Sequence, residues 1–138
     1  MSDPASKFDA WVAKAEEDRL CIRNNLGAAA VPWAVVCFHA QQAAEKYLKA
    51  FLVFKGDRVE RTHDLEILLQ ACVRHDAALQ SLLPDCDTLT AYAVDARYPD
   101  MLAEDPEKIA REAVRKSDSI CTTVAQRFPP GGRPAACV

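Results

Sequence analysis

The chain has 138 residues, half of them hydrophobic, and carries a formal net charge of −3 with a pI near 5.6. A chain of this length forms one domain with a core of its own. The acidic balance argues against a protein that binds nucleic acid over a broad basic surface, while it leaves room for a local basic groove. No apolar run approaches the roughly 20 residues that cross a bilayer, and residues 1–5 lack the pattern of a signal peptide.

Apolar residues at helical spacing predict a first helix over residues 6–28. A second predicted helix begins with Pro32 in its first turn and ends at Lys55, where Gly56 suits a left-handed cap. Its apolar residues span roughly 200° of arc, which is typical of a central helix with several neighbours. The residues expected to face the core are Val36, Cys37, Ala40, Ala43, Ala44, Tyr47, Leu48, Phe51, Leu52 and Phe54.

The second half of the chain predicts shorter helices. After a charged connector, Asp64 caps a helix over residues 65–74, residues 76–83 form one or two turns, and Pro84 ends them. A fourth helix covers residues 87–96, and the pair Asp105-Pro106 begins a last helix that runs to residue 127. We therefore predict an all-α, mostly up-and-down bundle of about five helices over residues 1–128, with residues 129–138 as a disordered tail.

A polar stripe runs along the predicted central helix. Its members His39, Gln42, Lys46 and Lys49 recur at helical spacing, and Glu45 neutralises one of the lysines. Two lysines and a histidine can hold a phosphate as point charges, and a glutamine can bond a base or a sugar. The same pattern also fits a face that contacts only solvent or a second subunit, so the stripe leaves both interpretations open.

One motif points to catalysis. Arg58 and His63 stand in an R-x4-H pattern, in which a histidine can transfer a proton and an arginine can stabilise charge on a phosphate. About 0.6 matches of this kind are expected by chance in a chain with three histidines, so the motif is weak. The connector that carries it follows Gly56 and Asp57, and we expect it to hold side chains loosely. The sequence therefore favours a binding protein over an enzyme.

Three blocks of sequence together resemble the HEPN domain family (higher eukaryote and prokaryote nucleotide-binding domain). They are Phe38-His39-Ala40-Gln41-Gln42-Ala43-Ala44-Glu45-Lys46 with Leu48-Lys49-Ala50, then Thr62-His63-Asp64-Leu65 with Leu68-Leu69, then Ala96-Arg97-Tyr98-Pro99. The resemblance extends over roughly residues 6–128. It implies a small helical protein, often dimeric, that commonly works beside a minimal nucleotidyltransferase, with a nucleotide or nucleic acid as its proposed ligand.

The resemblance and the stripe together define a candidate ligand site. Its predicted members are His39, Gln42, Lys46, Lys49, His63, Arg97 and Tyr98. Two alternatives remain. In ribonuclease members of the superfamily an R-x4–6-H motif cleaves RNA without a metal, which would make the chain the toxin of a toxin–antitoxin pair with Arg58 and His63 as catalytic residues. That motif belongs late in the domain, however, whereas here it precedes the third helix. The other alternative is a structural dimer or partner-docking protein.

The cysteines bear on compartment and cofactors. All six are scattered, with no pair at zinc-ligand spacing, so we expect no metal and no cofactor. Reduced cysteines used as small hydrophobic residues indicate a cytoplasmic protein. The width of the apolar arc, with Trp11 and Trp33 as core or interface residues, predicts a homodimer.

Overall fold

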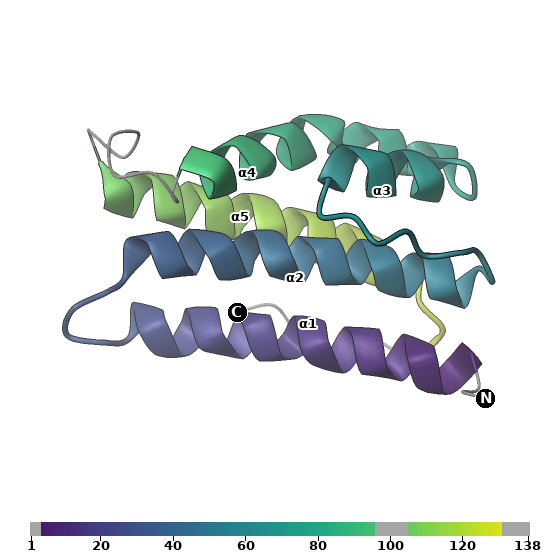
Figure 1. The fold of residues 1–138 in the computed structure, drawn as a ribbon, viewed down its shortest axis with the longest axis horizontal. Coiled ribbons are helices and arrows are strands. Elements are labelled where there is room, and N and C mark those ends of the chain that lie inside the picture. Colours follow the sequence, from purple (N-terminus) through teal and green to yellow (C-terminus); the bar gives the residue numbers. More distant parts are fainter. Residues whose placement is uncertain (1–3, 96–104, 131–138) are drawn as a thin grey trace.

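The computed structural model describes residues 4–95 and 105–130, and all its regular elements in these ranges are helical (Figure 1). The elements are α1 (Pro4–Leu26), α2 (Trp33–Phe54), α3 (Leu65–Val73), the short 3₁₀ helix η1 (Ala77–Leu82), α4 (Leu83–Asp95) and α5 (Pro106–Ala125). Helices α1 and α2 run side by side in opposite directions, and α5 lies on the other side of α2 (Figure 1). The predicted fold class, an all-α bundle, is confirmed.

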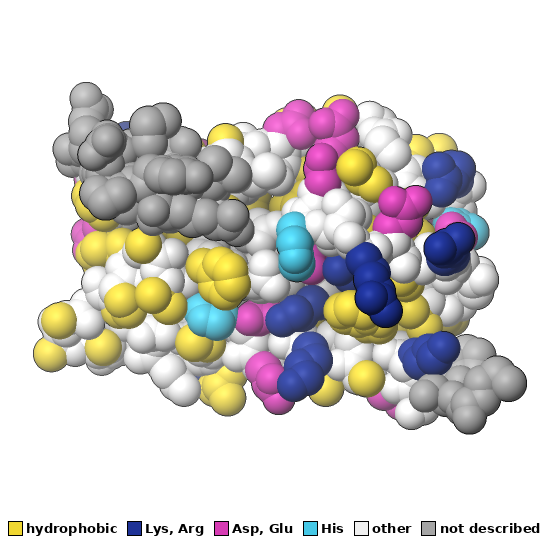
Figure 2. Space-filling view, in the orientation of Figure 1, with side chains coloured by type: hydrophobic (Ala, Val, Ile, Leu, Met, Phe, Trp, Pro, Cys, Tyr) yellow, Lys and Arg dark blue, Asp and Glu magenta, His cyan; other side chains and the backbone are white. Residues whose placement is uncertain are grey.

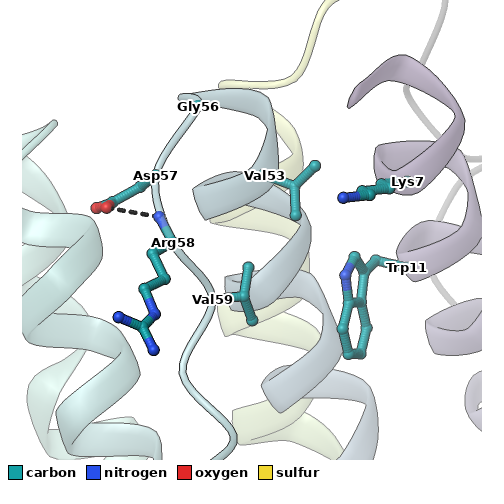
Figure 3. A pocket seen from close by; sticks show the side chains of 7 residues that line it. All are labelled: Lys7, Trp11, Val53, Gly56, Asp57, Arg58 and Val59. Carbon is teal, nitrogen blue, oxygen red and sulfur yellow. Dashed lines mark hydrogen bonds between the residues drawn. The ribbon is translucent and has the colours of Figure 1, made fainter. Parts of the chain in front are cut away.

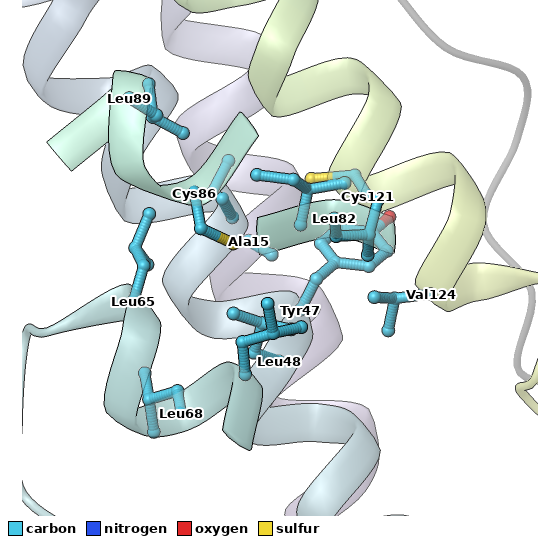
Figure 4. Close-up of a cluster of buried hydrophobic side chains, with 14 of the residues drawn as sticks. Ala15, Tyr47, Leu48, Leu65, Leu68, Leu82, Cys86, Leu89, Cys121 and Val124 are labelled. Carbon is cyan, nitrogen blue, oxygen red and sulfur yellow. The ribbon is translucent and has the colours of Figure 1, made fainter. Parts of the chain in front are cut away.

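Helix α2 is the centre of the bundle because it packs against α1, α3, α4 and α5. Tyr47, Leu48 and Phe51 on α2 are fully buried, and Figure 4 shows Tyr47 and Leu48 among side chains from the surrounding helices. Every residue of the predicted apolar arc is buried except Phe54, which is 38% exposed. One chain thus covers this arc by itself, so the width of the arc does not require a second subunit.

The predicted helix ends agree with the structure where a side chain or a glycine defines them. The Asp64 carboxylate accepts hydrogen bonds from the backbone N–H groups of Glu66 and Ile67 at the start of α3. Asp105 accepts from Lys108 N–H at 3.1 Å, with Pro106 in the first turn of α5. Gly56 has φ 72° after α2, the left-handed conformation that ends a helix at little cost only for glycine.

The role predicted for Pro84 is wrong. We expected this proline to break the chain before a helix at residue 87, whereas α4 begins at Leu83 and contains Pro84 in its first turn. A first-turn proline loses nothing, because its missing N–H would have no partner inside the helix. The preceding residues 77–82 form η1, whose cap Asp76 accepts from the backbone N–H of Ala78.

Phe51 supplies a direct test of how α2 is oriented. Its side chain is fully buried, whereas Phe38 on the same helix is 43% exposed. We expect Phe51→Ala to lower the free energy of unfolding by roughly 3–5 kcal/mol, the cost of a large cavity in a packed core. Phe38→Ala is the matched control and should cost less than about 1 kcal/mol in the same urea titration. Equal losses for the two variants would mean that α2 presents a different side to the core.

Candidate ligand-binding face

A carboxylate on α1 collects two members of the predicted stripe. Asp18 accepts a hydrogen bond from His39 Nδ1 at 2.8 Å through one oxygen and from Lys46 Nζ at 2.6 Å through the other. The Asp18 side chain is only 8% exposed, so both partners reach inward to it from α2. Asp18 therefore holds His39 and Lys46 at the contact between α1 and α2. The stripe predicted that the two residues share one side of α2, but not that α1 binds them.

Sequence reasoning did not identify Asp18. The signal was present, because Trp11, Ala15, Asp18 and Ile22 recur at the spacing of one helix face, and Ala15 and Ile22 are buried. A carboxylate at a position in register with core residues needs a partner, since an unpaired buried charge is very costly. Neighbours on α2 that carry positive charge were the natural candidates for that partner.

A second buried carboxylate, on α2 itself, binds the connector. Glu45, with a side chain 3% exposed, accepts from Lys49 Nζ at 3.0 Å and from His63 Nδ1 at 2.9 Å. Gln41, one turn earlier, donates its Nε2 to the backbone carbonyl of His63 at 3.0 Å, and Gln42 donates to the Gln41 side-chain oxygen. Two side chains of α2 thus hold the residue that precedes the cap of α3.

The residues of the stripe differ in how far a ligand can reach them. The His63 side chain is 78% exposed, whereas that of Lys49 is only 7% exposed and its ammonium lies 5.3 Å from the Trp11 ring centroid. Lys46 and His39 lie between these extremes. Figure 2 shows basic and histidine side chains interleaved with acidic ones on this face. Because Asp18 and Glu45 neutralise Lys46 and Lys49, the face carries little net charge from the stripe itself.

The connector is anchored at both ends, contrary to our expectation that it is loose. At its start, Asp57 accepts from His75 Nε2 at 2.9 Å and from the Arg58 backbone N–H at 2.7 Å. These two bonds hold the pKa of the Asp57 carboxyl below its usual value. At its end, Glu45 and Gln41 fix His63. Within the described residues, however, the Arg58 guanidinium makes no hydrogen bond to the His63 ring.

The remaining predictions concern two residues of the ligand site, the cysteines and a metal. Arg97 and Tyr98 lie outside the described residues. Burial raises the pKa of the Cys37 thiol to about 11 and of the Cys72 and Cys86 thiols to about 12, so these groups stay protonated at neutral pH. No cluster of three or more His, Cys, Asp or Glu residues in the described ranges has the arrangement of a metal site.

The comparisons with known proteins identify the family. The family model described as HEPN domain matches residues 8–127, so the chain belongs to the HEPN family. This agrees with the resemblance seen in the three sequence blocks. The comparisons with curated proteins and with solved structures find no match. None of the helices in residues 4–95 and 105–130 has both the length and the hydropathy that a membrane span requires.

Glu45→Gln tests how much the buried ion pair contributes to the fold. The substitution keeps the shape of the side chain but leaves the Lys49 ammonium buried without a counter-charge, which typically costs 3–5 kcal/mol. We expect a loss of roughly that size in the free energy of unfolding. The double variant Glu45→Leu with Lys49→Met should recover most of it, because no unpaired charge remains.

Glu60→Gln provides the control for this stability measurement. Glu60 is an exposed carboxylate on the connector, so its loss should change the free energy of unfolding by less than about 0.5 kcal/mol. If Glu45→Gln had an effect as small as Glu60→Gln, the pairing of Glu45 with Lys49 and His63 would not contribute to stability.

Proposed function

We propose that this chain is a nucleotide- or nucleic-acid-binding HEPN module that recognises phosphate groups on the face formed by α1, α2 and the connector. The observation that carries the proposal is the placement of His39, Lys46 and His63 on this face by two buried carboxylates. Each carboxylate takes the Nδ1–H of its histidine, and the Nε2 atoms have no hydrogen-bond partner in the described residues. In its protonated form an imidazole donates Nε2–H to a phosphate oxygen, as an ammonium group does, whereas the Nε2 of the neutral ring can only accept.

The affinity expected of such a face is modest. Lys46 shares its charge with Asp18, and Lys49 shares its charge with Glu45. A phosphate therefore gains mainly from the exposed His63 and from the arginines of the connector, which make no ion pair within the described residues. Contacts dominated by phosphate charge weaken steeply as salt rises. The proposal is consequently a weak, salt-dependent site rather than a tight nucleotide pocket.

Membership in the family also supports proposals about partners. We propose a homodimer that acts in the cytoplasm beside a minimal nucleotidyltransferase. Leu20, Val35 and Phe38 are exposed large apolar residues, and they belong to the second half of α1 and the first half of α2. Exposed apolar residues of this kind are often found where subunits meet. The same end of the visible face is largely hydrophobic in Figure 2.

The test is a titration of the protein with a short oligoadenylate. We expect Lys46→Gln and His63→Gln each to weaken binding about 10-fold, as loss of a charge-assisted hydrogen bond does. Raising the salt from about 50 mM to 200 mM should weaken wild-type binding about 10-fold. Lys116→Gln is the control, because Lys116 pairs with Asp85 on the α4–α5 side of the molecule. Equal effects of all three variants, or no binding at low salt, would contradict the proposal.

The ribonuclease alternative has one favourable observation. Glu45 orients the His63 imidazole with Nε2 outward, which is how a carboxylate prepares a histidine to act as a base. The arginine of the motif is not placed beside this histidine, because the Arg58 guanidinium makes no hydrogen bond to the His63 ring within the described residues. We therefore expect purified protein to leave the same oligoadenylate intact. Robust cleavage that Arg58→Ala or His63→Ala abolishes would establish the enzyme instead.

A further inference from the structure

A groove lies beside the binding face and involves none of the residues assigned to it so far except those of the connector. It has a volume of about 420 Å³ and is lined by Lys7 and Trp11 of α1, Val53 of α2 and connector residues 56–59. In Figure 3 the side chains of Lys7 and Trp11 face those of Val53 and Val59 across it. Its volume lies within the range of small-molecule sites, roughly 300–1,000 Å³.

The walls of the groove suit a flat ring. Trp11 offers an indole, and Val53 and Val59 close the opposite side with apolar methyl groups (Figure 3). The Lys49 ammonium lies 5.3 Å from the Trp11 ring centroid, and Glu45 fixes it at 3.0 Å. This contact helps to hold the indole beside α2. Aromatic side chains of this kind stack on nucleobases of any sequence.

The rim of the groove carries Lys7, an exposed cation that makes no ion pair with the described residues. The Arg58 side chain points to the other side of the connector (Figure 3). The carboxylate in the lining, Asp57, already pairs with His75. Lys46 and Lys49, by contrast, pair with buried carboxylates. The open positive charge of this surface thus lies next to its apolar slot, which complements a ligand that joins a planar ring to an anion.

We propose that this groove binds one nucleoside phosphate, with the base against Trp11 and the two valines and the phosphate on Lys7. The inference rests on the proposed function, since it assigns a base-binding subsite to the same face. A free nucleotide and one residue of a single-stranded RNA share this chemistry. A groove that instead receives an apolar side chain of a protein partner would show no preference for a base with a phosphate.

Trp11 itself reports on binding. In a Trp33→Phe background Trp11 is the one remaining tryptophan, and Trp33 stands at the opposite end of α2 from the groove. We expect AMP and a short oligoadenylate to quench the Trp11 fluorescence in a saturable way, because a stacked base quenches an indole. Ribose 5-phosphate, which has no base, should not. Tighter binding of the oligonucleotide than of AMP would identify RNA as the source, and equal binding would identify the free nucleotide.

Charge-reversal variants on α1 test whether binding depends on the groove itself or only on the overall charge of the protein. Lys7→Glu should weaken binding by about 10-fold or more, because it removes a charge-assisted phosphate contact and adds repulsion. Lys14→Glu is the matched control two turns along α1, where Lys14 is exposed and pairs with Glu17, and should weaken binding less than about 3-fold. Trp11→Ala should weaken it between about 5- and 100-fold by loss of stacking. Lys7 is exposed, so its variant remains informative if Trp11→Ala fails to fold.

The inference is wrong if AMP and the oligonucleotide leave the Trp11 fluorescence unchanged, if ribose 5-phosphate quenches it equally, or if Lys7→Glu and Lys14→Glu have the same effect. Its failure differs from failure of the proposed function. If Lys46→Gln and His63→Gln weaken oligonucleotide binding while Lys7→Glu behaves like Lys14→Glu, the face binds phosphate and the groove does not bind the base. Absence of binding by every probe at low salt would reject both.

Discussion

The buried carboxylate of Glu45 is the constraint on which this face depends. An ionised carboxylate without partners is very costly in a protein interior, so its position on the central helix demands cationic or N–H donors nearby. Lys49 supplies one from the next turn of α2, and His63 supplies the other from the connector. The connector must therefore return across α2, and Gln41 reinforces that path through the His63 carbonyl. The next residue, Asp64, then caps α3, so the bond from His63 to Glu45 ties the start of that helix to α2.

The pairing of buried carboxylates with lysines also limits the ligands that the face can bind. A stripe that contains two lysines and a histidine suggests a strong phosphate site, but Asp18 and Glu45 already satisfy both lysines. What remains for a ligand is the exposed His63 ring, Lys7 at the groove and Arg58 on the connector, and these two cations make no ion pair within the described residues. The two carboxylates thus have two effects: they position the histidines, and they lower the net positive charge of the face. This accounts for an acidic chain with a local, modest site for phosphate rather than a broad basic surface.

Local features of the fold could be predicted from the sequence, and distant pairings could not. The Asp64 and Asp105 caps and the turn at Gly56 depend on neighbouring residues, and all three are confirmed. The role of Pro84 was predicted wrongly because a proline can either follow the end of one helix or occupy the first turn of the next. The spacing of Asp18 with Ala15 and Ile22 indicates a buried carboxylate, but its partners His39 and Lys46 lie 21 and 28 residues away, and no local pattern identifies them. Phe54, at the end of the apolar arc, is more exposed than helical spacing alone indicates.

The most direct measurement of the central claim is the nitrogen spectrum of the three imidazoles. A carboxylate can only accept, so each hydrogen bond dictates which ring nitrogen carries the proton in neutral histidine. His39 and His63 donate through Nδ1 to Asp18 and Glu45, whereas His75 donates through Nε2 to Asp57. The account predicts two Nδ1–H tautomers and one Nε2–H tautomer, and Glu45→Gln should alter the His63 signals alone. An Nε2–H tautomer at His63 in the wild-type protein would contradict it.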